Sequence, residues 1–167
     1  MATPSAPDTS VPQKIDPTMP KSWSRVVITS VSPSVEDGRW PIKRAVGESV
    51  EVTGGVICDS HESLAVELVY RHEDASEEQV ERMTPAGNDE YVGQFSTQKL
   101  GTYRYRVRAW LDRFATWQDA FERRVAGGVG GAELESELLD GASILRKALE
   151  NASGKDAELL ETHADAF

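Results

Sequence analysis

Residues 102–112 read TYRYRVRAWLD, and their side chains alternate in character with a period of two. The odd-numbered positions are aromatic or apolar: Tyr103, Tyr105, Val107, Ala109 and Leu111. The even-numbered positions carry three arginines: Arg104, Arg106 and Arg108. This alternation is typical of a β-strand that packs one face on a core and turns the other to water. We therefore predict an antiparallel sheet that contains this strand.

The same period recurs between residues 22 and 126. In residues 63–72, SLAVELVYRH, one face carries Leu64, Val66, Leu68 and Tyr70. Further candidate strands are residues 25–31, 49–58, 79–83, 90–96 and 116–125, with turn signals at residues 37–38, 47–48, 85–89 and 101. Seven short strands in about 100 residues predict an immunoglobulin-like antiparallel β-sandwich.

The pattern changes on both sides of this region. Residues 1–21 hold five prolines among serines and threonines, which predicts a disordered leader. After residue 126, Leu134, Leu138, Ala142, Leu145 and Leu149 recur at helical spacing, and a second helical pattern occupies residues 157–167. Two helices with one apolar stripe each cannot close a core by themselves. We therefore expect residues 127–167 to start a helical bundle that continues beyond Phe167 in a longer protein.

The composition argues against several classes of function. The 167 residues include 28 acidic and 18 basic side chains, a net charge of −10, which argues against binding to nucleic acid. No stretch approaches the roughly 20 apolar residues that span a membrane. A single cysteine, Cys58, cannot form an internal disulfide, so we expect a cytoplasmic protein.

The residues that could carry chemistry do not form a recognisable site. Cys58 and His61 have a Cys-x-x-His spacing, but His72 is the only nearby third ligand and zinc requires four. The sequence has no Gly-x-Ser-x-Gly nucleophile turn, and its paired carboxylates fall in turns, loops or exposed helix faces. We expect no catalytic residue, metal site or cofactor in this chain.

Two stretches are candidates for contact with other surfaces. Residues 38–49, GRWPIKRAVGES, place Trp40 close to Lys43 and Arg44 in an otherwise acidic protein. This segment either contacts an anion or a partner from a loop, or uses Trp40 to plug the open end of the sandwich.

The second stretch is residues 109–117, AWLDRFATW. The strand alternation turns Trp110 and Asp112 outward, and we expect Asp112 and Arg113 to form a polar turn into a following strand. Trp110 and Trp117 are too large to remain bare without a reason. They either stack on sugar rings or are covered by another domain or subunit, and the incomplete helical part favours the covered surface.

Several motifs occur together in the order found in one enzyme family. They are residues 38–52, 64–72, 83–95, 101–117 and 137–145. In this order and spacing the chain resembles the amino-terminal region of the α-1,4-glucan:maltose-1-phosphate maltosyltransferases, bacterial members of the α-amylase superfamily. The resemblance covers about residues 23–149.

The resemblance implies an accessory and dimerisation role for this chain. In that family a catalytic (β/α)8 barrel follows the sandwich and the helical insertion, and transfers maltosyl units from α-maltose 1-phosphate to the non-reducing end of α-1,4-glucans, with release of phosphate. The retaining reaction uses an aspartate and a glutamate of the barrel, so no catalytic residue is carried over to this chain. We expect the partners to be the barrel and a second subunit, contacted by Trp40, Lys43, Arg44, Trp110, Asp112, Arg113 and Trp117. A free-standing α-glucan-binding sandwich, or the amino-terminal domain of a related branching or debranching enzyme, is the alternative.

Overall fold

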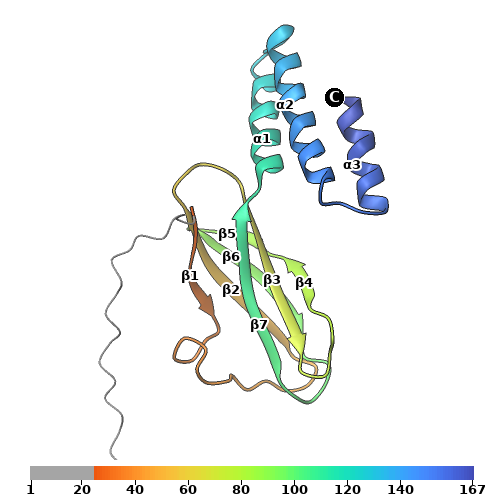
Figure 1. The fold of residues 1–167 in the computed structure, drawn as a ribbon. Helices are drawn as coiled ribbons and strands as arrows, with labels where there is room; N and C mark the ends of the chain where they lie inside the picture. The colour runs from red at the N-terminus through yellow and green to blue at the C-terminus, as the bar shows by residue number, and fades with distance from the viewer. Residues whose placement is uncertain (1–24) are drawn as a thin grey trace, which may run out of the picture.

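A computed structural model describes residues 25–167, which form seven β-strands followed by three α-helices (Figure 1). The strands are β1 (Val26–Ser32), β2 (Ser49–Cys58), β3 (Leu64–His72), β4 (Gln79–Arg82), β5 (Thr84–Gly87), β6 (Glu90–Ser96) and β7 (Tyr103–Leu111). The helices are α1 (Arg113–Ala126), α2 (Ala132–Leu149) and α3 (Lys155–Ala166). Residues 1–24, and with them the expected leader at residues 1–21, lie outside the described part of the chain.

The strands form two antiparallel sheets, with the orders β1-β2-β6-β5 and β4-β3-β7. The predicted mainly-β sandwich followed by helices is confirmed, and the strand at residues 102–112 pairs along its length with β3. Because β7 runs away from the loops at one end of the sandwich, it delivers the chain to α1 at the other end (Figure 1).

The two sheets enclose one apolar core. Its buried members are Val50, Val52, Val56, Val66, Leu68, Met83, Phe95 and Val107. Two glycines on adjacent strands let the sheets approach closely: a Cβ on Gly54 would lie 3.1 Å from a methyl of Val107, and one on Gly93 would lie 3.0 Å from Met83. Burying branched apolar side chains at this density stabilises the sandwich by about 1.5–3 kcal/mol per side chain.

The core ends in an aromatic cluster at the end of the sandwich remote from the helices. Tyr70 stacks on Phe95 with ring centroids 4.6 Å apart, while Tyr103 and Tyr105 lie 5.9 and 5.6 Å from Phe95. The Tyr105 hydroxyl donates a hydrogen bond to the carbonyl of Pro33. The cluster thereby ties β7 to the segment that follows β1.

One predicted strand is wrong: residues 116–125 lie within helix α1, not in a strand. Phe114, Trp117 and Phe121 recur at spacings of three and four, which places them on one face of a helix. Asp112 caps its first turn and Arg123 and Arg124 occupy its last turn, where cations suit the helix dipole. Residues 25–167 therefore contain three helices instead of two, and the helical part begins within the range 22–126 assigned to the sandwich.

Strand β5 was also missed, because residues 85–89 were interpreted only as a turn. Asn88 and Asp89 adopt positive φ values of 51° and 60° between Gly87 and Glu90, which pair with one another across β5 and β6. Two consecutive residues with positive φ make the tight hairpin turn that joins antiparallel strands. The turn is real, and a short strand precedes it directly.

The two predicted helices are confirmed as α2 and α3, and the apolar stripe of α2 faces the neighbouring helices. Ala142 and Leu145 of α2 and Ala164 of α3 are buried. Among residues 25–167 no helix combines the length and the apolar character needed to cross a membrane.

Candidate contact sites at the strand–helix junction and at the opposite end of the sandwich

The junction between β7 and α1 is fixed by Asp112. Its carboxylate accepts the backbone N–H of Ala115 at 3.0 Å, the hydrogen bond of a helix N-cap. Its backbone N–H donates to the carbonyl of Ser63 at 2.8 Å, while the Thr116 hydroxyl donates to the Asp112 carbonyl at 2.7 Å. The expected polar turn at Asp112 is therefore the start of a helix, and both its backbone and its side chain hold that start.

The loop between β2 and β3 braces this junction from the side. Ser63 donates its backbone N–H to the Thr116 hydroxyl at 2.9 Å and its own hydroxyl to Asp119 of α1 at 2.8 Å. Because both bonds cross from the sandwich to the helix, they fix the direction in which α1 leaves the sheet.

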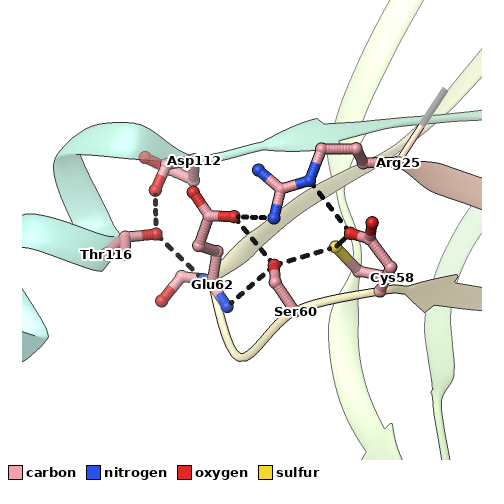
Figure 2. A network of polar contacts seen from close by, with 8 residues as sticks. Arg25, Cys58, Ser60, Glu62, Asp112 and Thr116 are labelled. Atoms are coloured by element: carbon pink, nitrogen blue, oxygen red, sulfur yellow. Dashed lines mark hydrogen bonds and ion pairs between the residues drawn. The ribbon is translucent and has the colours of Figure 1, made fainter. Parts of the chain in front are cut away.

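The same loop is held to the start of β1 by a charged network (Figure 2). Arg25 contacts Asp59 at 2.9 Å and Glu62 at 2.6 Å, and the Ser60 hydroxyl donates to Glu62 at 2.8 Å. The Cys58 thiol lies 3.3 Å from the Ser60 oxygen and 3.7 Å from a carboxylate oxygen of Asp59, to which it donates. Cys58, the last residue of β2, therefore has a structural role: its thiol contacts the loop that follows.

Trp110 lies on the outer face of the β4-β3-β7 sheet, as the alternation predicted. The guanidinium carbons of Arg82 and Arg108 lie 5.8 and 5.6 Å from its ring centroid, within the range of cation–π contact. Arg108 also pairs with Glu67 at 2.5 Å, and Arg82 pairs with Asp112 at 3.2 Å. With both arginines held by carboxylates, the indole remains 39% exposed in a fixed orientation.

The rest of this outer face is rich in arginine. Arg106 pairs with Glu78 at 2.5 Å, and this hydrogen bond lowers the pKa of Glu78. Arg71 and Arg104 stand directly opposite one another on β3 and β7, and neither forms an ion pair with a carboxylate of residues 25–167. Like charges that lie directly opposite one another on adjacent strands lower the stability of a sheet unless an opposite charge lies close to them.

Arg113 and Trp117, the other two residues expected at a contact, lie on α1. Arg113 is the exposed first residue of the helix. Trp117 packs inside the helical part: its indole N–H donates to the Glu137 carbonyl at 2.8 Å and its ring lies 5.4 Å from Phe167. A Cβ on Gly141 would lie 2.3 Å from the Trp117 ring, so the bare backbone of α2 makes room for this side chain.

Trp40, Lys43 and Arg44 lie at the opposite end of the sandwich. Trp40 is 53% exposed, and its indole N–H donates to Glu36 at 3.0 Å while the Arg39 guanidinium lies 5.4 Å from its ring. It borders a groove of about 700 Å³ beside β7, so it does not plug the end of the sandwich. Lys43 and Arg44 border an adjoining hollow. The predicted contact residues thus form two groups at opposite ends of β7.

The titratable groups near this second end have structural partners. The two ring nitrogens of His72 meet the Leu100 carbonyl at 3.0 Å and the Asp74 backbone N–H at 3.2 Å, so both nitrogens have partners in the loops. Backbone hydrogen bonding from Thr102 lowers the pKa of Glu73. In residues 25–167 no group of three or more His, Cys, Asp or Glu side chains is placed to hold a metal ion.

Sequence reasoning missed three residues that shape these sites. Glu67 and Arg82 meet Arg108 and Trp110 only through the register of β3 with β4 and β7, and that register is not evident from one strand at a time. Gly141 faces Trp117 across two helices, and the helical spacing of Phe114, Trp117 and Phe121 was the signal that could have revealed this packing.

By fold, residues 25–167 define a two-sheet β-sandwich that carries a three-helix appendage. Residues 24–167 match the family described as α-1,4-glucan:maltose-1-phosphate maltosyltransferase, domain N/S. The chain therefore belongs to the α-1,4-glucan:maltose-1-phosphate maltosyltransferase family.

Individual relatives carry the same name. The maltosyltransferase of Salinibacter ruber is 60% identical over 149 residues, which are 89% of this chain and 22% of that protein. Those of Chlorobaculum tepidum and Myxococcus xanthus are 30% and 34% identical, over 81% and 76% of this chain and 20% and 19% of theirs. The chain spans about a fifth of the length of these curated relatives.

Proposed function

We propose that this chain is the amino-terminal accessory and dimerisation domain of a cytoplasmic maltosyltransferase of glycogen or α-glucan biosynthesis. The whole enzyme transfers maltosyl units from α-maltose 1-phosphate to the non-reducing end of α-1,4-glucans, with release of phosphate and retention of configuration. A following catalytic barrel supplies the reacting carboxylates, and this chain alone is inactive. The match of residues 24–167 to domain N/S of this family is the single observation that carries the proposal.

The contact role rests on the outer face of the β4-β3-β7 sheet. Trp110 is held between two arginines that are themselves fixed by Glu67 and Asp112, so its side chain loses little further freedom on being covered. Aromatic and arginine side chains are the residues most enriched in the centres of protein interfaces. Leu139 of α2 and Leu159 of α3, which are 64% and 58% exposed, extend the apolar surface offered by the helical part.

The activity of the chain and its part in dimerisation can be measured separately. Mixed with α-maltose 1-phosphate and glycogen, the chain alone releases no phosphate, whereas the full-length enzyme does. Sedimentation of the full-length enzyme gives a dimer, and Trp110→Ala shifts it toward the monomer, while Val27→Ala, a change at an exposed residue of β1 in the other sheet, does not. Phosphate release by the chain alone, or a dimer unaffected by Trp110→Ala, contradicts the corresponding part.

A second function, binding of α-glucan by the sandwich itself, is favoured by the exposed indole of Trp40 beside the groove of about 700 Å³. It predicts that glycogen in a native gel retards the chain and that Trp40→Ala abolishes the retardation. If the retardation survives in that variant and is lost in Trp110→Ala, the glucan lies on the sheet face instead. The family assignment sets aside a branching or debranching enzyme as the parent.

A further inference from the structure

A hollow of about 380 Å³ opens at the end of the sandwich remote from the helices, next to the groove beside Trp40, with which it shares Ile42, Tyr103 and Tyr105. It lies between the loop that leads into β2 and the loop that joins β6 to β7 (Figure 1). Its floor is the aromatic cluster of Phe95, Tyr103 and Tyr105, and Ile42 and Leu100 line it as well. Its volume lies in the range of small-molecule sites.

The charges around this hollow are all of one sign. Lys43, Arg44 and Lys99 line it, and no aspartate or glutamate of the described residues does, although the chain carries a net charge of −10. None of the three cations pairs with a carboxylate of residues 25–167. Three of the five arginines of the neighbouring sheet face differ in this respect, since Arg82, Arg106 and Arg108 are each held by an acidic side chain.

Hydrogen-bond donors also remain available in the hollow. One nitrogen of the Arg44 guanidinium donates to the Lys43 carbonyl at 2.8 Å, which leaves most of its five N–H groups free. The Tyr103 hydroxyl oxygen accepts the backbone N–H groups of Gln98 and Lys99 at 3.0 and 3.1 Å. Because both of these contacts use its oxygen as acceptor, its proton is free to donate to a ligand.

From this combination we infer that the hollow binds a small sugar phosphate. The phosphate takes the charges of Arg44, Lys43 and Lys99, since guanidinium and ammonium groups are the usual partners of phosphate oxygens. The apolar face of the sugar ring packs on the tyrosines of the floor, and the hydroxyls meet the free Tyr103 proton. The choice of a sugar phosphate over other anionic ring compounds rests on the proposed function, and the site lies in this chain, apart from any catalytic barrel.

The test is calorimetric titration of the 167-residue chain with α-maltose 1-phosphate at about 0.05 M salt, where charge screening is moderate. We expect saturable binding, and binding at least about tenfold weaker in the double variant Lys43→Ala/Arg44→Ala. The matched control is Arg71→Ala/Arg104→Ala, which removes two charges that are equally unpaired but lie outside the hollow. This control retains affinity within about twofold. Both pairs are exposed, so circular dichroism and the melting temperature of each variant check that the fold is kept.

Three results overturn the inference. The first is no saturation up to about 10 mM ligand, which corresponds to less than about 3 kcal/mol of binding free energy. The second is an equal loss of affinity in the two double variants, which would show that only the overall charge of the chain attracts the ligand. The third is that inorganic phosphate binds as tightly as α-maltose 1-phosphate, which would show that the sugar ring adds nothing to the affinity.

The remaining alternative is that a second copy of the chain occupies the hollow. If the wild-type chain sediments as a dimer, Lys43→Ala/Arg44→Ala sediments as a monomer, and neither binds the sugar phosphate, the ligand site is excluded. The inference and the proposed function fail separately, because phosphate release by the full-length enzyme tests the reaction and titration of the chain tests the hollow.

Discussion

Asp112 joins the two halves of the molecule with three different groups. Its carboxylate caps α1, its backbone N–H binds the β2–β3 loop, and its second carboxylate oxygen pairs with Arg82. Asp112→Ala leaves the N–H of Ala115 without this cap, so we expect the free energy of unfolding to fall by about 1 kcal/mol. Urea unfolding followed by fluorescence measures this change in the free energy of unfolding.

Asp140→Ala provides the matched control for this prediction. Asp140 is an exposed residue of α2 with no hydrogen bond or ion pair among the described residues, and alanine favours a helix interior. The control therefore unfolds at the same or slightly higher urea concentration. Equal destabilisation by the two changes would show that the cap contributes nothing.

Gly141 is the residue of α2 that admits the Trp117 ring. In an exposed helix interior Gly→Ala stabilises by about 1 kcal/mol. Here the new Cβ falls within 2.3 Å of the ring, so we expect Gly141→Ala to destabilise the helical part by about 1–3 kcal/mol. The free energy of unfolding in urea measures this loss.

Trp117→Phe removes the ring atoms that clash, so a double variant with Gly141→Ala recovers part of the loss caused by Gly141→Ala. Strictly additive effects in this double-mutant cycle would contradict the contact.

At the scale of elements, the alternation of polar and apolar residues predicted six of the seven strands of residues 25–167. The signal is clearest in β2, β3, β6 and β7, which bury one face in a shared core. It misassigned residues 116–125, where Phe114, Trp117 and Phe121 satisfy a helical spacing that the interpretation as a strand did not consider. It missed β5, because its residues Thr84–Gly87 are exposed and overlap the turn signal of the hairpin that follows. A strand is distinguished from a helix at residues 116–125 only when the spacing of the apolar residues and the helix cap at Asp112 are considered together.

The loop after β3 is clasped to the loop before β7 by Glu73. Its carboxylate accepts the backbone N–H of Thr102 at 2.9 Å, and its own N–H donates to the Thr102 carbonyl at 2.9 Å. The hydrogen bond to the ionised form lowers the pKa of Glu73. A carboxylate with a lowered pKa in the folded state adds stability above its unfolded pKa, and this is lost as the pH falls through the folded value.

We therefore expect Glu73→Gln to lower the free energy of unfolding at pH 7, with the difference from wild type shrinking as the pH falls below about 4. Glu77→Gln, an exposed change in the same loop with no hydrogen bond in the described residues, serves as the control and tracks the wild type. Urea unfolding across the pH range measures all three proteins. A difference that persists unchanged in acid would contradict a role for the ionised carboxylate.

At the scale of the whole molecule, charge is distributed unevenly. Residues 127–167 carry nine acidic and three basic side chains, whereas the β4-β3-β7 face displays Arg71, Arg82, Arg104, Arg106 and Arg108. The sequence identified the tryptophans as contact candidates from their size alone. It could not separate Trp110, which stays on the surface, from Trp117, which fills the helical part, because the difference depends on the direction in which α1 leaves the sheet.

The central claim is that another domain or subunit of the full-length enzyme covers the Trp110 face of this chain. Hydroxyl-radical footprinting tests it most directly, by comparing the oxidation rate of Trp110 in the chain alone and in the full-length enzyme. Phe95, buried in the core of the sandwich, is the internal reference. The account predicts that Trp110 is oxidised several-fold more slowly in the full-length enzyme while the low rate at Phe95 is unchanged. An equal rate for Trp110 in the two proteins would contradict it.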